Sequence, residues 1–551
     1  MPQPDVSLSE RYSDEEVRGY YDAGFWRSET LYDNLVEQAV DRPDKVLLFD
    51  STQSYTYAEL RDQGLRLAVG LRRLGVQPGD RVAIQIPNWA EFGLLTVALN
   101  RAGAIVVPIM PIYRAEEVGY VLSHSEATVA ITCEDFKGFD YLGMFTDLRA
   151  TAPELRELVA VRAGEGVSGA TRLEDLLVEG DADALAEELG PDTGPDQGFL
   201  IIYTSGTTAR PKGCFHTVNT LRATAYAMAA SLEYTESDVQ FGPSPISHAT
   251  GIMTSFLLPL VTGASSHLME AWEPVEGMRR VQEHGCTVSV TATAFLQMMM
   301  GAFDPAANDL SSMRIWVCAG SPIPGSVVER ARTMLSGGRV LSLYGRSENF
   351  LTTMCTVEDP PERSATSDGS ALHGASVKIV DAFGAEVPRG EEGDIAYKGP
   401  SHMLQYYRNV EETAALYTPD GHSRSGDLGR MDQDGFIRVT GRLKDIVIRG
   451  GMNISARELE DLLGEHPAVG SVAVVGYPDD RLGERVCAYV VPAVGSEAPT
   501  LDELNEFLKA RKLATQKLPE RLELTTALPM TATGKVQKHV LRDEVAKKVL
   551  A

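Results

Sequence analysis

Residues 203–213 read Tyr-Thr-Ser-Gly-Thr-Thr-Ala-Arg-Pro-Lys-Gly and directly follow a run of apolar residues. Flexible backbone and hydroxyl donors can surround phosphate oxygens, and Lys212 can neutralise their charge. The spacing is not Gly-x4-Gly-Lys-Ser/Thr, so the segment is not a Walker loop. A loop of serine, threonine and glycine is by itself most often a plain turn. The prediction of a phosphate site therefore depends on the rest of the chain.

Short apolar runs recur along the chain, and each is followed at once by a turn of small or polar residues. They lie at 81–86, 105–109, 199–203, 287–290, 314–317 and 340–343. Helical patterns lie between them, such as the one that begins after Thr56, with Glu59 completing a capping box, and ends at Gly75. This alternation predicts a layered α/β fold, in which ligands bind where the strands end.

The pattern changes near residues 441–445. Beyond this point the sequence predicts a strand at 446–449, a helix capped by Ser455 and Glu458, strands at 472–476 and 486–491, and a helix from Leu501. We therefore expect a large N-terminal domain of layered α/β subdomains over residues 1–441 and a small α+β domain over residues 447–551.

The composition excludes several classes of function. With 51 Lys and Arg against 77 Asp and Glu, the formal net charge is −26, which disfavours nucleic acid and anionic membranes as partners. The polar N-terminus and the lack of a long apolar run predict neither secretion nor membrane insertion. The six cysteines are scattered without metal-ligand spacing, so we expect reduced thiols in a cytoplasmic protein.

Taken in order, several segments resemble the motifs of the adenylate-forming superfamily, which contains acyl-CoA synthetases, aryl-AMP ligases and adenylation domains. The matching segments are 203–213, 319–322 (Ala-Gly-Ser-Pro), 344–348 (Tyr-Gly-Arg-Ser-Glu), 425–427 (Ser-Gly-Asp), 441–445 (Gly-Arg-Leu-Lys-Asp) and 533–535 (Thr-Gly-Lys). Within the superfamily the chain is similar to cyclohexanecarboxylate and other short-to-medium-chain or aromatic acid–CoA ligases. Its aromatic opening, residues 20–26, looks like both those ligases and stand-alone aryl-AMP ligases.

The resemblance implies a set of ATP- or AMP-binding residues. They are Thr204, Ser205, Gly206, Thr207, Thr208, Lys212, Gly320, Ser321, Pro322, Tyr344, Gly345, Ser347, Asp427 and Arg442. Tyr344 offers an aromatic face to adenine, the hydroxyl of Ser347 reaches the α-phosphate, and Asp427 accepts from the ribose hydroxyls. Glu348 is expected to bind Mg²⁺, because a hard carboxylate oxygen suits a cation that bridges ATP phosphates.

The expected catalytic residues are Lys535, which would bridge carboxylate and phosphate, together with Arg442 and His248. His248, Phe295 and Arg346 are expected in the acid pocket, Gly450 and Gly451 along the CoA channel, and Lys444 at the hinge. The resemblance further implies that residues 442–446 form this hinge and that the small domain is mobile. His216 is expected to be structural. Arg346 is a departure, because the family residue at this position is often apolar. A cation there suggests a second polar or anionic group on the substrate, and a local ion pair is the alternative.

The implied reaction is ATP-dependent activation of an acid as its adenylate, followed by transfer of the acyl group to CoA. ATP, Mg²⁺ and CoA are the expected cofactors, and a small-molecule acid is the expected substrate. One alternative is a stand-alone enzyme that passes the adenylate to a carrier-protein thiol or an amine. Another is activation of an unusual acid, such as nitrous acid for attack by an aryl amine.

Overall fold

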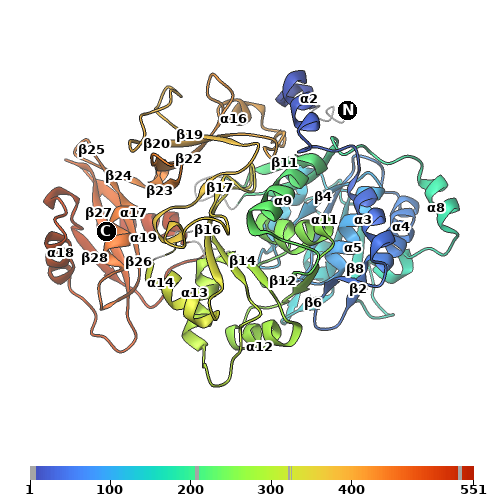
Figure 1. The fold of residues 1–551 in the computed structure, drawn as a ribbon, viewed down its shortest axis with the longest axis horizontal. Helices are drawn as coiled ribbons and strands as arrows, with labels where there is room; N and C mark the ends of the chain where they lie inside the picture. Colours follow the sequence, from blue (N-terminus) through green and yellow to red (C-terminus); the bar gives the residue numbers. More distant parts are fainter. Residues whose placement is uncertain (1–7, 205–209, 321–322, 324, 531–535, 551) are drawn as a thin grey trace. The chain divides into compact units, whose positions relative to one another are not determined.

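The computed structural model describes residues 8–204, 210–320, 323, 325–530 and 536–550, which divide into two compact units. The first unit comprises the residues up to Thr204, Pro211–Ser376 and Lys398–Ala415. The second contains Val377–Tyr397 and the residues from Leu416 onward. Figure 1 shows the elements of both in chain colours.

One sheet of the first unit is mostly parallel. Across the sheet its strands are β18 (Ser370–Ala371), β17 (Thr353–Met354), β16 (Arg339–Tyr344), β15 (Ile315–Ala319), β14 (Val288–Ala292), β12 (Val239–Gly242), β13 (Ser265–Leu268), β1 (Val46–Phe49) and β2 (Ser54–Thr56). The strands from β16 to β1 run parallel, and β2, β17 and β18 are antiparallel additions at the edges.

The other large sheet of this unit carries the 203–213 motif. Its strands are β21 (Gln405–Tyr406), β11 (Gly213–Thr217), β10 (Gly198–Tyr203), β4 (Ile105–Pro108), β3 (Arg81–Gln85), β5 (Val129–Cys133), β8 (Glu157–Val161) and β9 (Thr171–Arg172). Here β10 and β11 form an antiparallel pair, whereas β10 lies parallel to β4. The motif therefore connects two adjacent strands.

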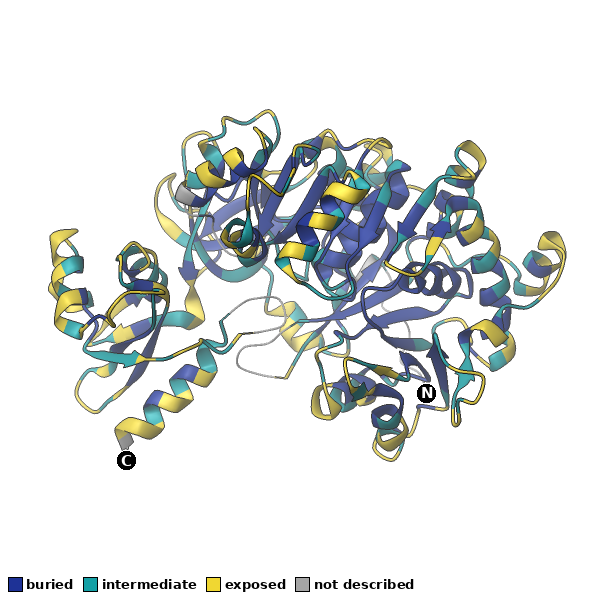
Figure 2. Cartoon of the chain, turned by 90° about the horizontal axis from the view of Figure 1, so that it is seen from below, coloured by how far each residue is buried: buried dark blue, intermediate teal, exposed yellow. Residues whose placement is uncertain are grey.

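The predicted apolar runs are confirmed as buried strands. All residues of β4 and β15 are buried, which explains why their sequences are apolar without alternation. Figure 2 shows central strands in dark blue, covered by helices that are partly yellow, the colour of exposed residues. The predicted early helix is α4 (Tyr57–Leu74), with Thr56 as its capping-box residue and Gly75 left-handed at its end, φ 112°. None of the helices in the described part of the chain is long and apolar enough to cross a membrane.

The second unit has two smaller sheets. One contains β19 (Ser376–Val380), β20 (Glu392–Lys398), β22 (Ser423–Met431) and β23 (Ile437–Arg442), and the other contains β25 (Met452–Ser455), β24 (Ile446–Arg449), β27 (Gly483–Pro492), β26 (Val469–Asp479) and β28 (Arg521–Leu524). In the latter, alternate strand residues pack either with helices α17 (Ala456–Leu463) and α18 (Leu501–Ala510) or with α19 (Lys538–Leu550). This is the alternation expected for a strand that is buried on both faces.

The predicted elements beyond residue 445 are confirmed, including the Ser455 cap, whose side chain accepts a hydrogen bond from the Glu458 amide. The compact second unit is larger than the predicted C-terminal domain, because it also takes in residues 377–397 and 416–446. The division into 1–441, 442–446 and 447–551, and the mobility of the last part, stay predictions.

Helix α4 packs so closely that one glycine has no room for a side chain. A Cβ at Gly70 would lie 1.9 Å from the carbonyl oxygen of Leu176. Replacing glycine by alanine inside a helix normally stabilises it by about 1 kcal/mol. We expect Gly70→Ala instead to lower the free energy of unfolding by about 1–3 kcal/mol, because backbone must shift. Urea unfolding measures this change.

The matched control is Gly19→Ala in helix α2 (Asp14–Asp22), where nothing lies within 4 Å of the added Cβ. The free energy of unfolding of this variant should rise by about 0.5–1 kcal/mol. If both variants were stabilised, the close approach of α4 to Leu176 would be refuted.

Candidate functional site

Four parallel strands of the first sheet end at one edge, and each leads to a predicted site residue. His248 follows β12, Phe295 lies in the helix α13 (Thr293–Ala302) that begins directly after β14, Gly320 follows β15, and Tyr344 ends β16. In open α/β sheets, ligands bind at such carboxyl ends. The fold thus brings together four residues that are far apart in the sequence.

The motif between β10 and β11 is closed at its base by backbone hydrogen bonding. The Thr204 amide donates to the Lys212 carbonyl at 2.9 Å, and the Lys212 amide donates to Thr204 Oγ1 at 3.3 Å. The predicted phosphate-binding residues Ser205, Gly206, Thr207 and Thr208 lie outside the described residues, as do Ser321 and Pro322. Both described ends of the motif are therefore held in register by the sheet.

Tyr406 joins the Lys212 cation to the predicted metal ligand. The Lys212 ammonium forms an ion pair with Glu412 and lies 4.7 Å from the centre of the Tyr406 ring. The Tyr406 hydroxyl donates to Glu348 Oε1 at 2.5 Å. Burial, together with the Glu348 charge, raises the pKa of Tyr406, so the phenol stays protonated and keeps donating. A cation, a phenol and a carboxylate are thereby held in one arrangement.

The turn that contains Arg346 needs a glycine next to it. A Cβ at Gly345 would lie 2.0 Å from the Phe350 carbonyl oxygen, so only glycine fits at this close approach. The turn is tightened by hydrogen bonds from the Asn349 amide to the Arg346 carbonyl at 3.2 Å and from Arg346 Nε to Asn349 Oδ1 at 3.1 Å. Arg346 is thus oriented by a neutral amide.

The same turn is hydrogen-bonded to the second sheet. The fully buried ring of His216, on β11, donates from Nε2 to the Ser347 carbonyl at 2.8 Å. Burial lowers the pKa of His216 to about 4, so the ring is neutral at pH 7. The Met403 amide donates to the Glu348 carbonyl at 2.7 Å. His216, expected to be structural, therefore fixes the backbone of Ser347, and Met403 fixes that of Glu348.

His248 caps a short helix at the sheet edge. Its Nδ1 accepts from the Thr250 amide at 3.3 Å, so the neutral ring carries its proton on Nε2. Phe295 is 8% exposed, and its ring centre lies 4.9 Å from that of Trp272. His248 has a proton to donate, and Phe295 belongs to an aromatic wall.

In the second unit, Asp427 and Arg442 face each other across β22 and β23. Arg442 Nε donates to Asp427 Oδ1 at 2.5 Å, and the Asp427 side chain is 6% exposed against 47% for Arg442. Asp394 Oδ1 accepts from the Gly426 amide at 2.9 Å and from Ser425 Oγ at 3.3 Å. A second carboxylate thus shapes the backbone that presents Asp427.

The other predicted residues of this unit lie on exposed segments. Lys444 lies in a short 3₁₀ turn, and its carbonyl accepts from Arg542 Nη1 at 3.0 Å. Gly450 and Gly451 form the left-handed turn between β24 and β25, with φ values of 58° and 84°. Lys535 lies outside the described residues.

A metal ion in the first unit would depend on Glu348. Among the described residues, no three His, Cys, Asp or Glu side chains gather closely enough to hold a metal ion. A carboxylate has several lone pairs, so its bond from Tyr406 is compatible with coordination of a cation. Glu348 therefore suits Mg²⁺, which is typically held by one or two carboxylates together with substrate phosphates.

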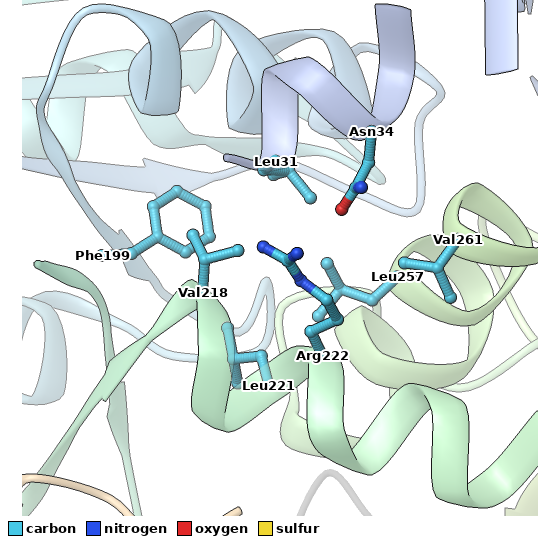
Figure 3. Close-up of a pocket in the computed structure, with 8 residues that line it drawn as sticks. All are labelled: Leu31, Asn34, Phe199, Val218, Leu221, Arg222, Leu257 and Val261. Carbon is cyan, nitrogen blue, oxygen red and sulfur yellow. The ribbon is translucent and has the colours of Figure 1, made fainter. Parts of the chain in front are cut away.

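A small cavity between helix α3 (Leu31–Asp41), β10 and helix α9 (Val218–Leu232) is not a substrate site. Figure 3 shows the Arg222 guanidinium and the Asn34 amide pointing into it among apolar side chains. Its volume of about 10 Å³ holds no more than one water molecule. Arg222 Nη2 donates to the Glu29 carbonyl, and burial lowers the pKa of Arg222. This arginine contributes to packing.

Sequence reasoning missed the residues that position the site. Tyr406 contacts Glu348 across 58 positions, His216 contacts Ser347 across 131, and Asp394 contacts Gly426 across 32. None of them belongs to a recognisable motif, and no local signal marks them. Only the pairing of strands brings them to the site.

The sequence matches the family described as AMP-binding enzyme over residues 35–407, and its C-terminal domain over residues 458–535. A medium-chain fatty-acid–CoA ligase of Escherichia coli is 32% identical, with 99% of this chain and 96% of the relative covered. The salicyl-AMP ligase/salicyl-S-ArCP synthetase of Mycobacterium tuberculosis is 33% identical, with coverage of 98% and 95%. The structure of ATP-bound MatB from Rhodopseudomonas palustris is similar with a TM-score of 0.81, at 27% identity and coverage of 95% and 100%.

These matches confirm the expected fold class and the use of ATP. The matched relatives cover the strand ends that lead to His248 and Tyr344. They also cover the β22–β23 pair, which carries Asp427. The chain therefore belongs to the AMP-binding enzyme family and is an adenylate-forming ligase.

Proposed function

We propose that this ligase converts an organic acid into its acyl-adenylate with release of diphosphate, and then transfers the acyl group to the thiol of CoA. The observation that supports the proposal is that the side chains of Lys212, Tyr406 and Glu348 contact one another in series at the turn that follows β16. The similarity to a fatty-acid–CoA ligase over 99% of this chain supports CoA as the acceptor. The six buried thiols fit a cytoplasmic enzyme.

In the first step, a carboxylate oxygen of the acid attacks the α-phosphorus of ATP, and the bond to diphosphate breaks. Two anions must be held together while negative charge gathers on the α-phosphate. We assign Lys212, Arg442 and Lys535 to neutralise this charge, and the Ser347 hydroxyl to donate to the α-phosphate. Tyr344 would support adenine, and Asp427 would accept from the ribose.

Glu348 is the residue we assign to Mg²⁺. When bound, the ion would neutralise charge on the phosphate oxygens. Tyr406 holds the Glu348 carboxylate from one side, and the Met403 amide holds its backbone. This chain's contribution is thus a carboxylate whose direction is fixed before ATP binds.

In the second step, the thiol sulfur attacks the acyl carbon and AMP leaves. We assign His248 to the acyl end of the site, where its Nε2 proton can be donated. Gly450 and Gly451 would line the path of the thiol, since glycines allow close approach. Lys444 would lie at the hinge of the small domain, which is expected to be mobile.

The acceptor and the acid are tested together by measuring AMP release from ATP and Mg²⁺. The acids should be aliphatic, alicyclic, aromatic, dicarboxylic and inorganic, each with and without CoA. AMP release that requires both an organic acid and CoA supports the proposal. If the adenylate forms and CoA does not accelerate AMP release, the acyl acceptor is not CoA. It would then be a carrier protein, as the name of the salicyl-AMP ligase relative suggests, or an amine.

Arg346 is proposed to contact a second polar or anionic group of the acid. Arg346→Met should shift the ratio of kcat/KM values by about tenfold towards apolar acids, because a buried polar group of the substrate would lose its partner. Arg346→Lys, which keeps the charge, should retain part of the preference. If the kcat/KM values of Arg346→Met rank the acids as in the unmodified enzyme, Arg346 does not contact the substrate.

Lys535 is proposed to act only in the first step. Lys535→Ala should slow acyl-AMP formation by about 10²–10³-fold, as expected when a group that stabilises developing charge is lost. Thioester formation from supplied acyl-AMP should change only a few-fold. The control is Lys509→Ala, which removes an exposed lysine paired with Glu506 on α18. Equal losses in both steps would contradict the assigned role.

A further inference from the structure

The aromatic opening of the chain is part of the core of the first unit. We call residues 8–27 the N-terminal clamp. Tyr12 and Trp26 are 2% and 1% exposed, and their rings meet edge to face with centres 5.0 Å apart. The rings of Tyr20 and Tyr21 lie 5.1 and 6.0 Å from Trp26. Such complete burial outside the sheets indicates a specific docking contact.

One side of the clamp is bonded to the segment 398–406. The Tyr12 hydroxyl donates to the His402 carbonyl at 2.5 Å, and Trp26 Nε1 donates to the Pro400 carbonyl at 2.9 Å. An ion pair joins Glu16 to Lys398 at 3.0 Å. Three side chains of the clamp therefore fix three successive points of this segment.

The other side of the clamp is bonded next to the strands that carry the 203–213 motif. The Tyr21 hydroxyl donates to Asp196 Oδ2 at 2.6 Å, just before β10. The Arg27 amide donates to Asn219 Oδ1 at 3.0 Å, just after β11, and Asn219 Nδ2 donates to Asp196 Oδ1 at 2.7 Å. The clamp thus ties the segment 398–406 to the base of the β10–β11 pair.

The segment held by the clamp is the one that holds Glu348. The residue after His402 is Met403, whose amide donates to the Glu348 carbonyl at 2.7 Å. Three residues further, the Tyr406 hydroxyl donates to the Glu348 carboxylate at 2.5 Å. The path from Tyr12 to Glu348 therefore consists of one side-chain hydrogen bond, one peptide unit and one backbone hydrogen bond.

We propose that the N-terminal clamp fixes the direction of the Glu348 carboxylate for metal–nucleotide binding, with Tyr12 as a positioning residue. The inference rests on the proposed role of Glu348 as the Mg²⁺ ligand. Tyr12 acts through the segment 398–406. Loss of its hydroxyl should loosen the Met403 and Tyr406 bonds to Glu348, and weaken metal binding without removing any ligand.

The test uses the full chain with Mn²⁺ as the probe for the metal, in the presence of ATP. For Tyr12→Phe, we expect the dissociation constant of Mn²⁺ measured by electron paramagnetic resonance to rise about fivefold, the effect of one buried hydrogen bond. Amide hydrogen exchange at Met403 should become faster by a similar factor. Trp26→Phe, which removes the bond to Pro400, should act in the same direction.

The matched control is Tyr141→Phe, which also deletes a hydroxyl that donates to a backbone carbonyl, that of Pro111, at 2.7 Å, from a ring that is 2% exposed. It should leave Mn²⁺ binding and Met403 exchange unchanged. Unchanged Mn²⁺ affinity in both Tyr12→Phe and Trp26→Phe would overturn the inference. Unchanged Mn²⁺ affinity in Glu348→Gln would instead overturn the metal role of Glu348, so the two failures are distinguishable.

Discussion

The hydrogen bond between His216 Nε2 and the Ser347 carbonyl joins the two large sheets of the first unit at the turn that carries Arg346, Ser347 and Glu348. Competing water cannot reach the His216 ring, because this ring is fully buried. Burial also keeps this ring neutral by lowering the pKa of His216 to about 4. A charged imidazole at this position would have to be desolvated at high cost. Through the neutral His216 ring, the sheet that contains β11 thus fixes the backbone of Ser347, which follows β16 of the other sheet.

The electrostatics of the site differ from those of the whole chain. A net charge of −26 repels a polyanion such as ATP at long range. Two of the cations assigned to the nucleotide already have acidic partners, namely Glu412 for Lys212 and Asp427 for Arg442. An incoming phosphate or ribose therefore exchanges one partner for another. Such exchange keeps the cations oriented, and it disfavours weak anions that cannot replace a carboxylate.

The fold class and several central strands could be predicted from the sequence, because β4, β15 and similar strands are buried on both faces and read as continuous apolar runs. The caps at Thr56 and Ser455 could be predicted because capping is local. Tyr344 could be placed directly after a strand, because it follows the predicted apolar run at 340–343.

The residues that orient the site could not be predicted in this way. Tyr406 and Asp394 lie in no motif, and their contacts exist only once strands distant in sequence are paired. The hydrogen bond from Arg346 Nε to the Asn349 amide was equally inaccessible to sequence reasoning, because it depends on the close turn of residues 345–350. Contacts of this kind depend on tertiary structure, which a single sequence does not display.

The last helix of the chain has a consequence for how the second unit can be altered. Leu541 and Val545 of α19 are buried against the sheet, while Arg542 between them bonds to the Lys444 carbonyl and to Asp445 at 2.9 Å. A single helix therefore both completes a core and braces the backbone where the hinge is expected. A chain shortened before Lys538 would lose the brace together with that part of the core. A bulky fusion at the C-terminus would perturb the same helix. Such a fusion could therefore change turnover without contacting the substrate.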